Sequence, residues 1–185
     1  MISLLDLKRQ HSQIKNQYLE KVSNILDNSS FIMGDEVKSF ERNIADYLGV
    51  KNAISVGNGT DALVIALKSL GIKAGDEVIT TDYTFFATAE SIRAVGATPV
   101  FVDVEKDTYN IDVSKIAEKI TDKTKAIMPV DIFGNPVNID AIKEIAKKHN
   151  LYVIEDACQA IGTEYRFKNG ERSLWTNCKS NWSGI

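Results

Sequence analysis

The sequence contains little cysteine, and what it has is not placed to bind metal. Only two cysteines occur in 185 residues, Cys158 and Cys178, and neither has the spacing of a metal site. So few cysteines exclude a small domain held together by disulfides. They favour a reducing compartment, so we expect the protein in the cytoplasm.

Two further classes are excluded by what the chain lacks. Lys and Arg number 22 against 25 Asp and Glu, for a net charge of -3, so there is no basic surface for nucleic acid. No window approaches the roughly 18 apolar residues of a membrane helix. The first residues, Met1-Ile2-Ser3-Leu4-Leu5-Asp6, carry no signal-peptide pattern. We therefore expect neither a nucleic-acid nor a membrane partner.

Hydrophobic periodicity predicts two helices followed by alternating strands and helices. Apolar residues recur at helical spacing over 14–26 and 37–48. Short β-rich runs follow at Ala53–Val56, Glu77–Thr80, Thr98–Val102, Ala126–Val130 and Tyr152–Glu155. Helical segments are expected between them at Asp61–Leu70, Thr84–Val95, Ser114–Ile120 and Ile139–Lys148. This alternation predicts an α/β fold with an open, mostly parallel sheet covered by helices on both faces.

The last part of the chain does not continue this pattern. After Tyr165 the residues show neither a helical nor a strand period, and both tryptophans of the chain lie there. We divide the chain into one domain at 1–165 and an off-pattern tail at 166–185, which we expect to be poorly ordered.

A glycine loop opens the first helix after the strand run at Ala53–Val56. Gly57-Asn58-Gly59-Thr60-Asp61 combines glycines, which allow close approach of the backbone, with the N–H groups of a helix start. These groups bind anions, and Thr60 adds a hydroxyl donor. The alternative is that Thr60 or Asp61 only caps the helix.

Two more segments follow strands and meet the same edge of a parallel sheet, where ligands bind. Phe85 and Phe86 cannot both point into the core, so one ring could lie against a planar ligand, or both could be an ordinary hydrophobic staple. Asp156 closes the apolar run at 152–154, where a buried carboxylate needs a cation. It could pair with a protonated pyridine nitrogen, cap a helix or bind a metal. Cys158 is interpreted as a small buried residue, not a nucleophile.

Taken together, these segments resemble the DegT/DnrJ/EryC1/StrS family, the pyridoxal-phosphate (PLP) aminotransferases of nucleotide-linked keto sugars. The resemblance runs from about Leu5 to about Tyr165. Its motifs include Phe31-Ile32-Met33-Gly34-Asp35, Gly59-Thr60-Asp61-Ala62-Leu63, Gly75-Asp76-Glu77-Val78-Ile79, Thr84-Phe85, Gly96-Ala97-Thr98-Pro99, Phe133-Gly134-Asn135-Pro136 and Glu155-Asp156-Ala157-Cys158-Gln159-Ala160.

The resemblance implies the large domain of a fold-type-I aminotransferase, with three layers around a mostly parallel sheet. It implies that Gly59 and Thr60 hold the PLP phosphate, that Phe85 stacks on the ring, that Asp156 pairs with the pyridine nitrogen and that Gln159 reaches the phenolic oxygen. It also implies an amino donor such as glutamate, a keto-sugar acceptor and a homodimer.

One element of the family is missing from the sequence. The lysine that forms a Schiff base with PLP follows a Phe-Ser-Phe-like strand in the family, and no such strand is present. Lys168 comes too early, and Lys179 lies in an unrelated context. We therefore identify no catalytic residue, and we expect a truncated large domain that is inactive alone. The alternative is a non-catalytic module that binds PLP or a nucleotide sugar, or that only oligomerises.

Overall fold

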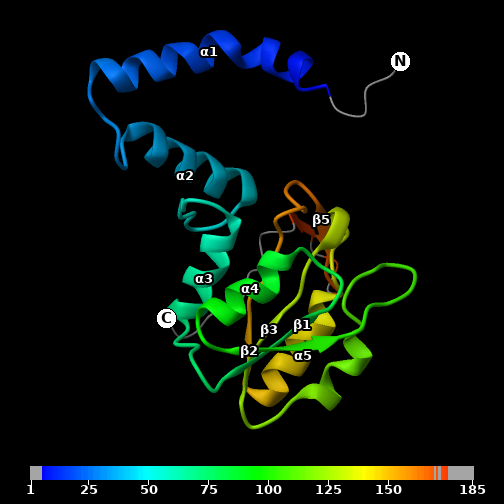
Figure 1. Ribbon diagram of the computed structural model, residues 1–185. Helices are drawn as coiled ribbons and strands as arrows, with labels where there is room; N and C mark the ends of the chain where they lie inside the picture. Colours follow the sequence, from blue (N-terminus) through cyan, green and yellow to red (C-terminus); the bar gives the residue numbers. More distant parts are fainter. Residues whose placement is uncertain (1–5, 169, 171, 175–185) are drawn as a thin grey trace. The chain divides into compact units, whose positions relative to one another are not determined.

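A computed structural model describes residues 6–168, 170 and 172–174 (Figure 1). The chain separates into two compact units, 1–44 and 45–185, and the helix at Asp35–Leu48 (α2) crosses the division. No helix in the described part of the chain is long and apolar enough to cross a membrane.

The first unit is helical. Helix α1 spans Leu7–Asp27, and the side chain of Asp6 caps it by accepting a hydrogen bond from the Arg9 N–H. Helix α2 spans Asp35–Leu48 and begins with two acidic residues, which favour the positive end of the helix dipole. Both helices predicted from the periodicity are confirmed, with α1 beginning earlier than the apolar pattern.

The second unit contains a four-stranded parallel sheet. Its strands are β1 (Glu77–Thr81), β2 (Thr98–Val102), β3 (Thr124–Met128) and β4 (Tyr152–Val153), in the order β2-β1-β3-β4. The chain leaves β1 toward β2 and then returns to the other side of β1 as β3. Loops after β1 and β3 therefore diverge at the carboxyl edge, which is where open α/β sheets bind ligands.

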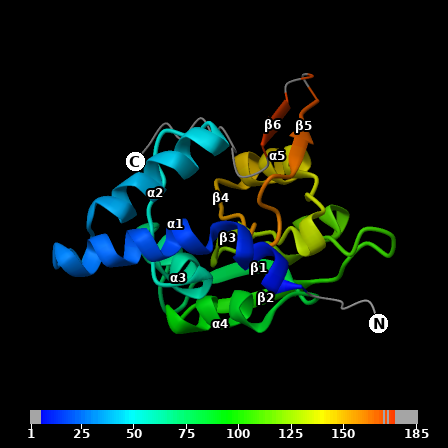
Figure 2. The same ribbon diagram turned by 90° about the horizontal axis from the view of Figure 1, so that it is seen from above.

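Helices cover both faces of this sheet, which makes three layers. They are α3 (Gly59–Ser69), α4 (Phe86–Ala94) and α5 (Ile139–His149), with α3 and α4 on one side and α5 on the other (Figure 2). Because successive strand residues point to opposite faces, Val78 joins a buried cluster with Leu67 of α3, whereas Ile79 packs in the cluster that contains Ile142 of α5. The predicted α/β class is confirmed, and so is the burial of Ala126, Ile127 and Met128 in β3, whereas Tyr152 of β4 is 39% exposed, contrary to the expectation of a strand covered on both sides.

Two predicted elements are not formed as expected. Residues 53–56 form no strand, and Ile54 is 82% exposed. A strand needs a neighbour for its backbone N–H and C=O groups, and no described strand pairs with this segment. The helix predicted at Ser114–Ile120 is two short 3-10 turns, η1 (Val113–Lys115) and η2 (Ala117–Lys119).

Strand ends also differ from the prediction, for a backbone reason. Strand β3 stops at Met128 because Pro129 has no N–H to donate to a neighbouring strand. Val130 instead forms an isolated parallel bridge with Asp156, beyond the end of β4. This bridge brings the two segments that follow β3 and β4 side by side.

The tail contains regular structure that the sequence pattern did not predict. Strand β5 (Glu164–Arg166) pairs antiparallel with β6 (Arg172–Leu174). A strand therefore follows Tyr165 at 172–174, although the residues there show no strand period. The domain boundary at 165 and the expected poor order of 166–185 stay predictions, and residues 175–185 of that tail lie outside the described residues.

Candidate functional site

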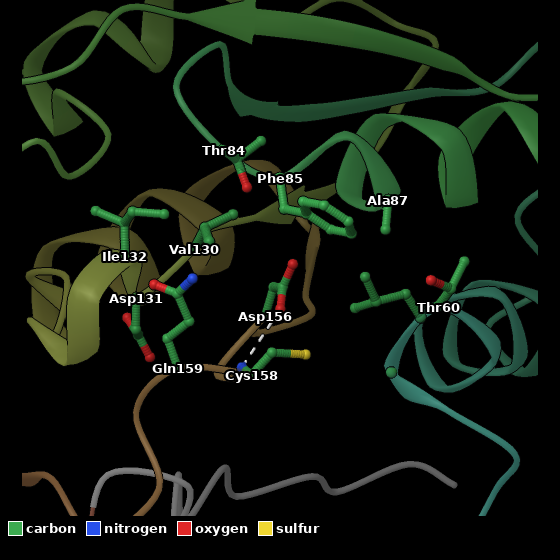
Figure 3. A pocket seen from close by; sticks show the side chains of 12 residues that line it. Thr60, Thr84, Phe85, Ala87, Val130, Asp131, Ile132, Asp156, Cys158 and Gln159 are labelled. Carbon is green, nitrogen blue, oxygen red and sulfur yellow. Dashed lines mark hydrogen bonds between the residues drawn. The ribbon is translucent and has the colours of Figure 1, made fainter. Parts of the chain in front are cut away.

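A cleft opens at the carboxyl edge of the sheet, beside the point where the chain reverses around β1 (Figure 3). Its volume is about 220 Å³. The lining residues are Gly59, Thr60, Leu63, Thr84, Phe85, Ala87, Val130, Asp131, Ile132, Asp156, Cys158 and Gln159. All five residues that the sequence suggested for cofactor binding therefore meet at one cleft.

The start of α3 presents two backbone donors to this cleft. Asn58 caps the helix, since its Oδ1 accepts a hydrogen bond of 2.9 Å from the Asp61 N–H. The capping interpretation of Thr60 and Asp61 is therefore wrong. The N–H groups of Gly59 and Thr60 form no hydrogen bond with a described residue, as is normal for the first helical positions. With the helix dipole, they suit an anion.

Gly59 is close-packed against the opposite wall of the cleft. A Cβ atom at this position would lie 3.0 Å from the sulfur of Cys158. Glycine therefore lets the α3 backbone approach the segment after β4, so the anion-binding N–H groups and Asp156 share one small space.

Phe85 extends from the loop between β1 and α4 over the cleft (Figure 3). Phe85 is 74% exposed and Phe86 is 73% exposed, so neither is packed in the core as a staple would be. Phe85 lines the cleft and Phe86 does not. An exposed ring at the wall of a cleft offers a flat apolar surface to a planar ligand.

Asp156 is buried, yet no cationic side chain of the described residues pairs with it. The residue is only 7% exposed, and no described residue forms an ion pair with its carboxylate. Oδ2 accepts a hydrogen bond of 2.8 Å from the Thr88 hydroxyl, and Oδ1 accepts a long bond of 3.4 Å from the Cys158 N–H. A buried carboxylate with so few donors is well suited to a cationic ligand.

Thr88 is a functional residue that the sequence analysis did not single out. Its hydroxyl lies 2.9 Å from that of Thr84, one turn earlier in the chain, and donates to Asp156. The pair Thr84 and Thr88 therefore fixes the rotamer of a carboxylate far away in sequence. Their spacing of four residues at a helix start was the available signal.

Asp131 was also missed. It is fully buried at the end of β3; Oδ1 accepts from the Val137 N–H at 3.1 Å, and Oδ2 has no partner among the described residues. Burial, and to a smaller extent the charge of Asp156, raises the pKa of Asp131 to about 7. Its carboxyl group therefore keeps a proton well above the usual pH range of an aspartate.

Gln159 points its amide into the cleft from the loop after Asp156. Its Oε1 accepts a hydrogen bond of 2.7 Å from the backbone N–H of Phe133. Figure 3 shows the amide nitrogen on the cleft side, and no described residue accepts from it. Gln159 therefore offers hydrogen-bond donors to a ligand.

Two side chains of possible reactivity do not serve as nucleophiles here. Cys158 is exposed, contrary to the expectation of burial, but local desolvation and contact with Asp156 raise the pKa of its thiol to about 11. No lysine lines the cleft among the described residues: Lys168 pairs with Glu144 at 3.0 Å, and Lys179 lies outside the described residues. No group of three or more His, Cys, Asp or Glu in the described part of the chain is arranged to hold a metal ion.

Known proteins resemble this chain in sequence and in structure. It is 48% identical over 167 residues to a pleiotropic regulatory protein of Geobacillus stearothermophilus, covering 90% of this chain and 45% of that protein. It is 44% identical over 180 residues to UDP-2-acetamido-2-deoxy-3-oxo-D-glucuronate aminotransferase of Pseudomonas aeruginosa, covering 97% and 50%. The chain thus spans about half the length of these relatives.

A solved structure agrees with the fold. The structure of NtdA from Bacillus subtilis with bound cofactor PMP superposes with a TM-score of 0.83 at 36% identity, over 87% of this chain and 37% of NtdA. The family profile of the DegT/DnrJ/EryC1/StrS aminotransferases matches residues 12–174, which extends past Tyr165. With its parallel sheet and its cleft at the carboxyl edge, this chain belongs to the DegT/DnrJ/EryC1/StrS aminotransferase family.

Proposed function

We propose that this chain is the cofactor-binding part of a PLP-dependent aminotransferase that converts a nucleotide-linked keto sugar to an amino sugar. The observation that carries the proposal is that one cleft contains both a group that favours a cation and a group that favours an anion. Asp156 is a buried carboxylate without a described cation, and the start of α3 offers free N–H groups to an anion. A pyridinium ring that bears a phosphate satisfies both.

Five residues divide the binding of this cofactor among them. The N–H groups of Gly59 and Thr60, with the Thr60 hydroxyl, bind the phosphate. Phe85 lies against the ring, Asp156 pairs with the protonated pyridine nitrogen, and Gln159 donates to the phenolic oxygen. Support comes from the common cleft, from the free donors of α3 and Gln159, and from the exposed ring of Phe85.

The charge of Asp156 is the chemically active contribution of this chain. Bound PLP supplies an electron-withdrawing ring that accepts and returns the amino group. The carboxylate of Asp156 keeps the ring nitrogen protonated, which maintains that electron withdrawal. Thr88 orients the carboxylate through its 2.8 Å hydrogen bond, so the charge does not need to rearrange when the ring binds.

We infer that the chain by itself binds the cofactor without transferring amino groups. No described lysine lines the cleft, so the chain described here offers no amine for a covalent bond to PLP. The remaining steps, with glutamate as amino donor and a keto sugar as acceptor, belong to the whole protein. The relative from Pseudomonas aeruginosa is itself named as an aminotransferase of a UDP-linked keto sugar.

We further propose that the protein acts as a cytoplasmic homodimer. Helix α1 has no buried residue, and Ile14, Tyr18 and Leu26 are at least 49% exposed along it. A second copy of the chain could cover such apolar side chains, and their burial would favour association. Light scattering coupled to size-exclusion chromatography would report twice the chain mass, and a lower mass in an Ile14→Lys variant. A wild-type chain that is monomeric at all concentrations contradicts this part of the proposal.

Titration with pyridoxamine 5′-phosphate (PMP) tests the cofactor site, because PMP needs no covalent bond to lysine. We expect saturable binding by the 185-residue chain. Asp156→Asn should weaken it on the order of 10- to 100-fold, since a charge-assisted hydrogen bond is lost. Asp122→Asn is the matched control, because Asp122 is an exposed residue before β3, at the opposite edge of the sheet. Equal PMP binding by both variants, with folding verified by circular dichroism, contradicts the proposal.

A further inference from the structure

The loop after β3 contains two successive residues in the left-handed backbone region. Phe133 has φ 56° and ψ 19°, and Gly134 has φ 75°. Glycine adopts this conformation freely, but a residue with a Cβ atom incurs an energetic penalty in it. Phe133 is 68% exposed, and its ring meets that of Tyr83 at a centroid distance of 6.3 Å, so burial of the ring does not account for this conformation.

The left-handed conformation of Phe133 directs its backbone N–H toward the side chain of Gln159. The Phe133 N–H donates to Oε1 of Gln159 at 2.7 Å. The turn is fixed at its other end, since the Gly134 N–H donates to the Asp131 carbonyl at 3.2 Å and the Thr163 hydroxyl donates to the Gly134 carbonyl at 3.0 Å. A Cβ atom on Gly134 would lie 3.0 Å from the Gln159 carbonyl oxygen, so the two loops are in close contact.

This hydrogen bond decides which end of the Gln159 amide faces the cleft. A backbone N–H can only donate, so it selects the amide oxygen and turns the NH₂ group the other way. In Figure 3 the NH₂ group of Gln159 lies on the side of the cleft, and the amide oxygen lies on the side away from it. Without the Phe133 N–H, either end of the amide could face a ligand.

We propose that Phe133 is a positioning residue whose left-handed backbone fixes the Gln159 amide as a hydrogen-bond donor to the phenolic oxygen of the cofactor ring. The inference rests on the proposed function, because it assigns a partner within the same site. A donor at this oxygen stabilises its deprotonated form, so the bound ring loses its phenolic proton at lower pH than a ring without the donor.

Substitutions at 133 separate the backbone from the ring. Phe133→Gly removes the ring contact with Tyr83, whose centroid lies 6.3 Å away, but it keeps the N–H and favours the left-handed conformation. PMP affinity and the pH of the phenolic transition in the PMP absorption spectrum should therefore change less than in the valine variant. Phe133→Val disfavours that conformation because of its branched Cβ. We expect PMP binding to weaken about tenfold and the transition to move to higher pH.

Tyr109 provides the matched control. It too is left-handed, with φ 59°, it is 48% exposed, and its ring also meets that of Tyr83, at a centroid distance of 5.3 Å. Its N–H, however, donates to the Glu105 carbonyl and not to Gln159. Tyr109→Val should lower the melting temperature as Phe133→Val does, yet leave PMP affinity and the phenolic transition unchanged. If both valine variants weaken PMP affinity equally, the cause is a general loss of stability and not the hydrogen bond to Gln159, and the inference is overturned.

Gln159→Glu tests the direction of the amide itself. The carboxylate can still accept from Phe133, but it presents an oxygen where the NH₂ group was. We expect weaker PMP binding and a phenolic transition at higher pH, because two negative oxygens would face each other. Unchanged PMP binding in Phe133→Val and Gln159→Glu, together with loss in Asp156→Asn, overturns this inference alone. No PMP binding by the wild-type chain overturns the proposed function.

Amide hydrogen exchange tests the hydrogen bond without any cofactor. The Phe133 amide should exchange slowly in the wild-type chain and faster in Gln159→Ala, while the Tyr109 amide is unaffected. Fast exchange of Phe133 in the wild type overturns the inference whatever PMP does.

Discussion

The hydroxyl of Thr88, on α4, donates a hydrogen bond of 2.8 Å to Oδ2 of Asp156, which follows β4. Both residues are buried, and they are 68 positions apart in the sequence. The contact orients the carboxylate of Asp156 in the cleft, although Thr88 itself does not line the cleft. It also connects helix α4, which follows β1, to the segment that follows β4, and β1 and β4 are not neighbours in the sheet.

Removing the hydroxyl of Thr88 should affect both stability and binding. In Thr88→Val the Asp156 carboxylate stays buried but loses its short hydrogen bond, and we expect the free energy of unfolding to fall by about 1–3 kcal/mol. PMP binding should weaken as well, because the carboxylate is no longer held in place. Urea unfolding and PMP titration measure the two effects.

Thr88→Ser is the control for that substitution. Serine keeps the hydroxyl and loses only a methyl group, so both quantities should remain close to the wild-type values. If serine and valine destabilise equally, packing at α4 and not the hydrogen bond to Asp156 is the function of Thr88.

Asp131 should make stability fall with rising pH. Its pKa is raised from 3.8 to about 7, so below about pH 4 the group is protonated in both the folded and the unfolded chain. Between about pH 4 and about pH 7 the unfolded chain gives up this proton and the folded chain keeps it. A tenfold difference in proton affinity between the two states corresponds to about 1.4 kcal/mol, so the stability lost across this window is on the order of 4 kcal/mol.

Asp131→Asn removes this titration. The melting temperature of the variant relative to the wild type should rise as pH increases from about 4 to about 7 and then level off. Asp103→Asn serves as the comparison, because the hydrogen bond from Lys115 lowers the pKa of the exposed Asp103. Its contribution is lost only as the pH falls below that window, so its difference from the wild type should stay flat. A flat difference for Asp131→Asn as well would mean that the carboxyl titrates normally.

Sequence reasoning found the parts of the site that are encoded locally. Gly59 and Thr60 open a helix after an extended segment, and Asp156 ends an apolar run, so each could be placed at the carboxyl edge from its immediate neighbours. The parallel direction of the strands followed from the same alternation, but their order in the sheet did not. These features depend on short stretches of chain, which is why they were predictable.

What sequence reasoning missed depends on contacts between distant segments. Thr88 acquires its role through Asp156, and the Phe133 N–H through Gln159. The raised pKa of Asp131 comes mainly from its burial in the folded chain. The segment 53–56 has the composition of a strand, but pairing needs a neighbour that composition cannot reveal. The hairpin β5–β6 was hidden because its strands are too short to show a period.

The thiol of Cys158 should react slowly for an exposed cysteine. With its pKa raised to about 11, almost none of it is thiolate at neutral pH, and thiolate is the reactive form. In a Cys178→Ser background, which leaves one thiol, the rate of alkylation by iodoacetamide should keep increasing up to about pH 11. Saturating PMP should slow it, because Cys158 lines the cleft. A rate that levels off near pH ~8.5, the ordinary thiol pKa, contradicts the raised value.

The contact between Gly59 and Cys158 can be measured as a coupling energy. A Cβ atom at 59 would lie 3.0 Å from the Cys158 sulfur, so Gly59→Ala should push α3 away from the cleft and lower the free energy of unfolding. Cys158→Ala removes the sulfur, and the double variant should therefore be more stable than the sum of the single effects, by about 0.5–3 kcal/mol. Urea unfolding of the four proteins gives this coupling. PMP binding should recover along with stability if the methyl group disturbs only the sulfur. It should stay weak if the phosphate itself needs the space above Gly59, because Cys158→Ala leaves the new methyl group beside the anion-binding N–H groups. Additive effects on stability would mean that α3 can shift without meeting Cys158, and the close approach of the two walls would then not shape the cleft.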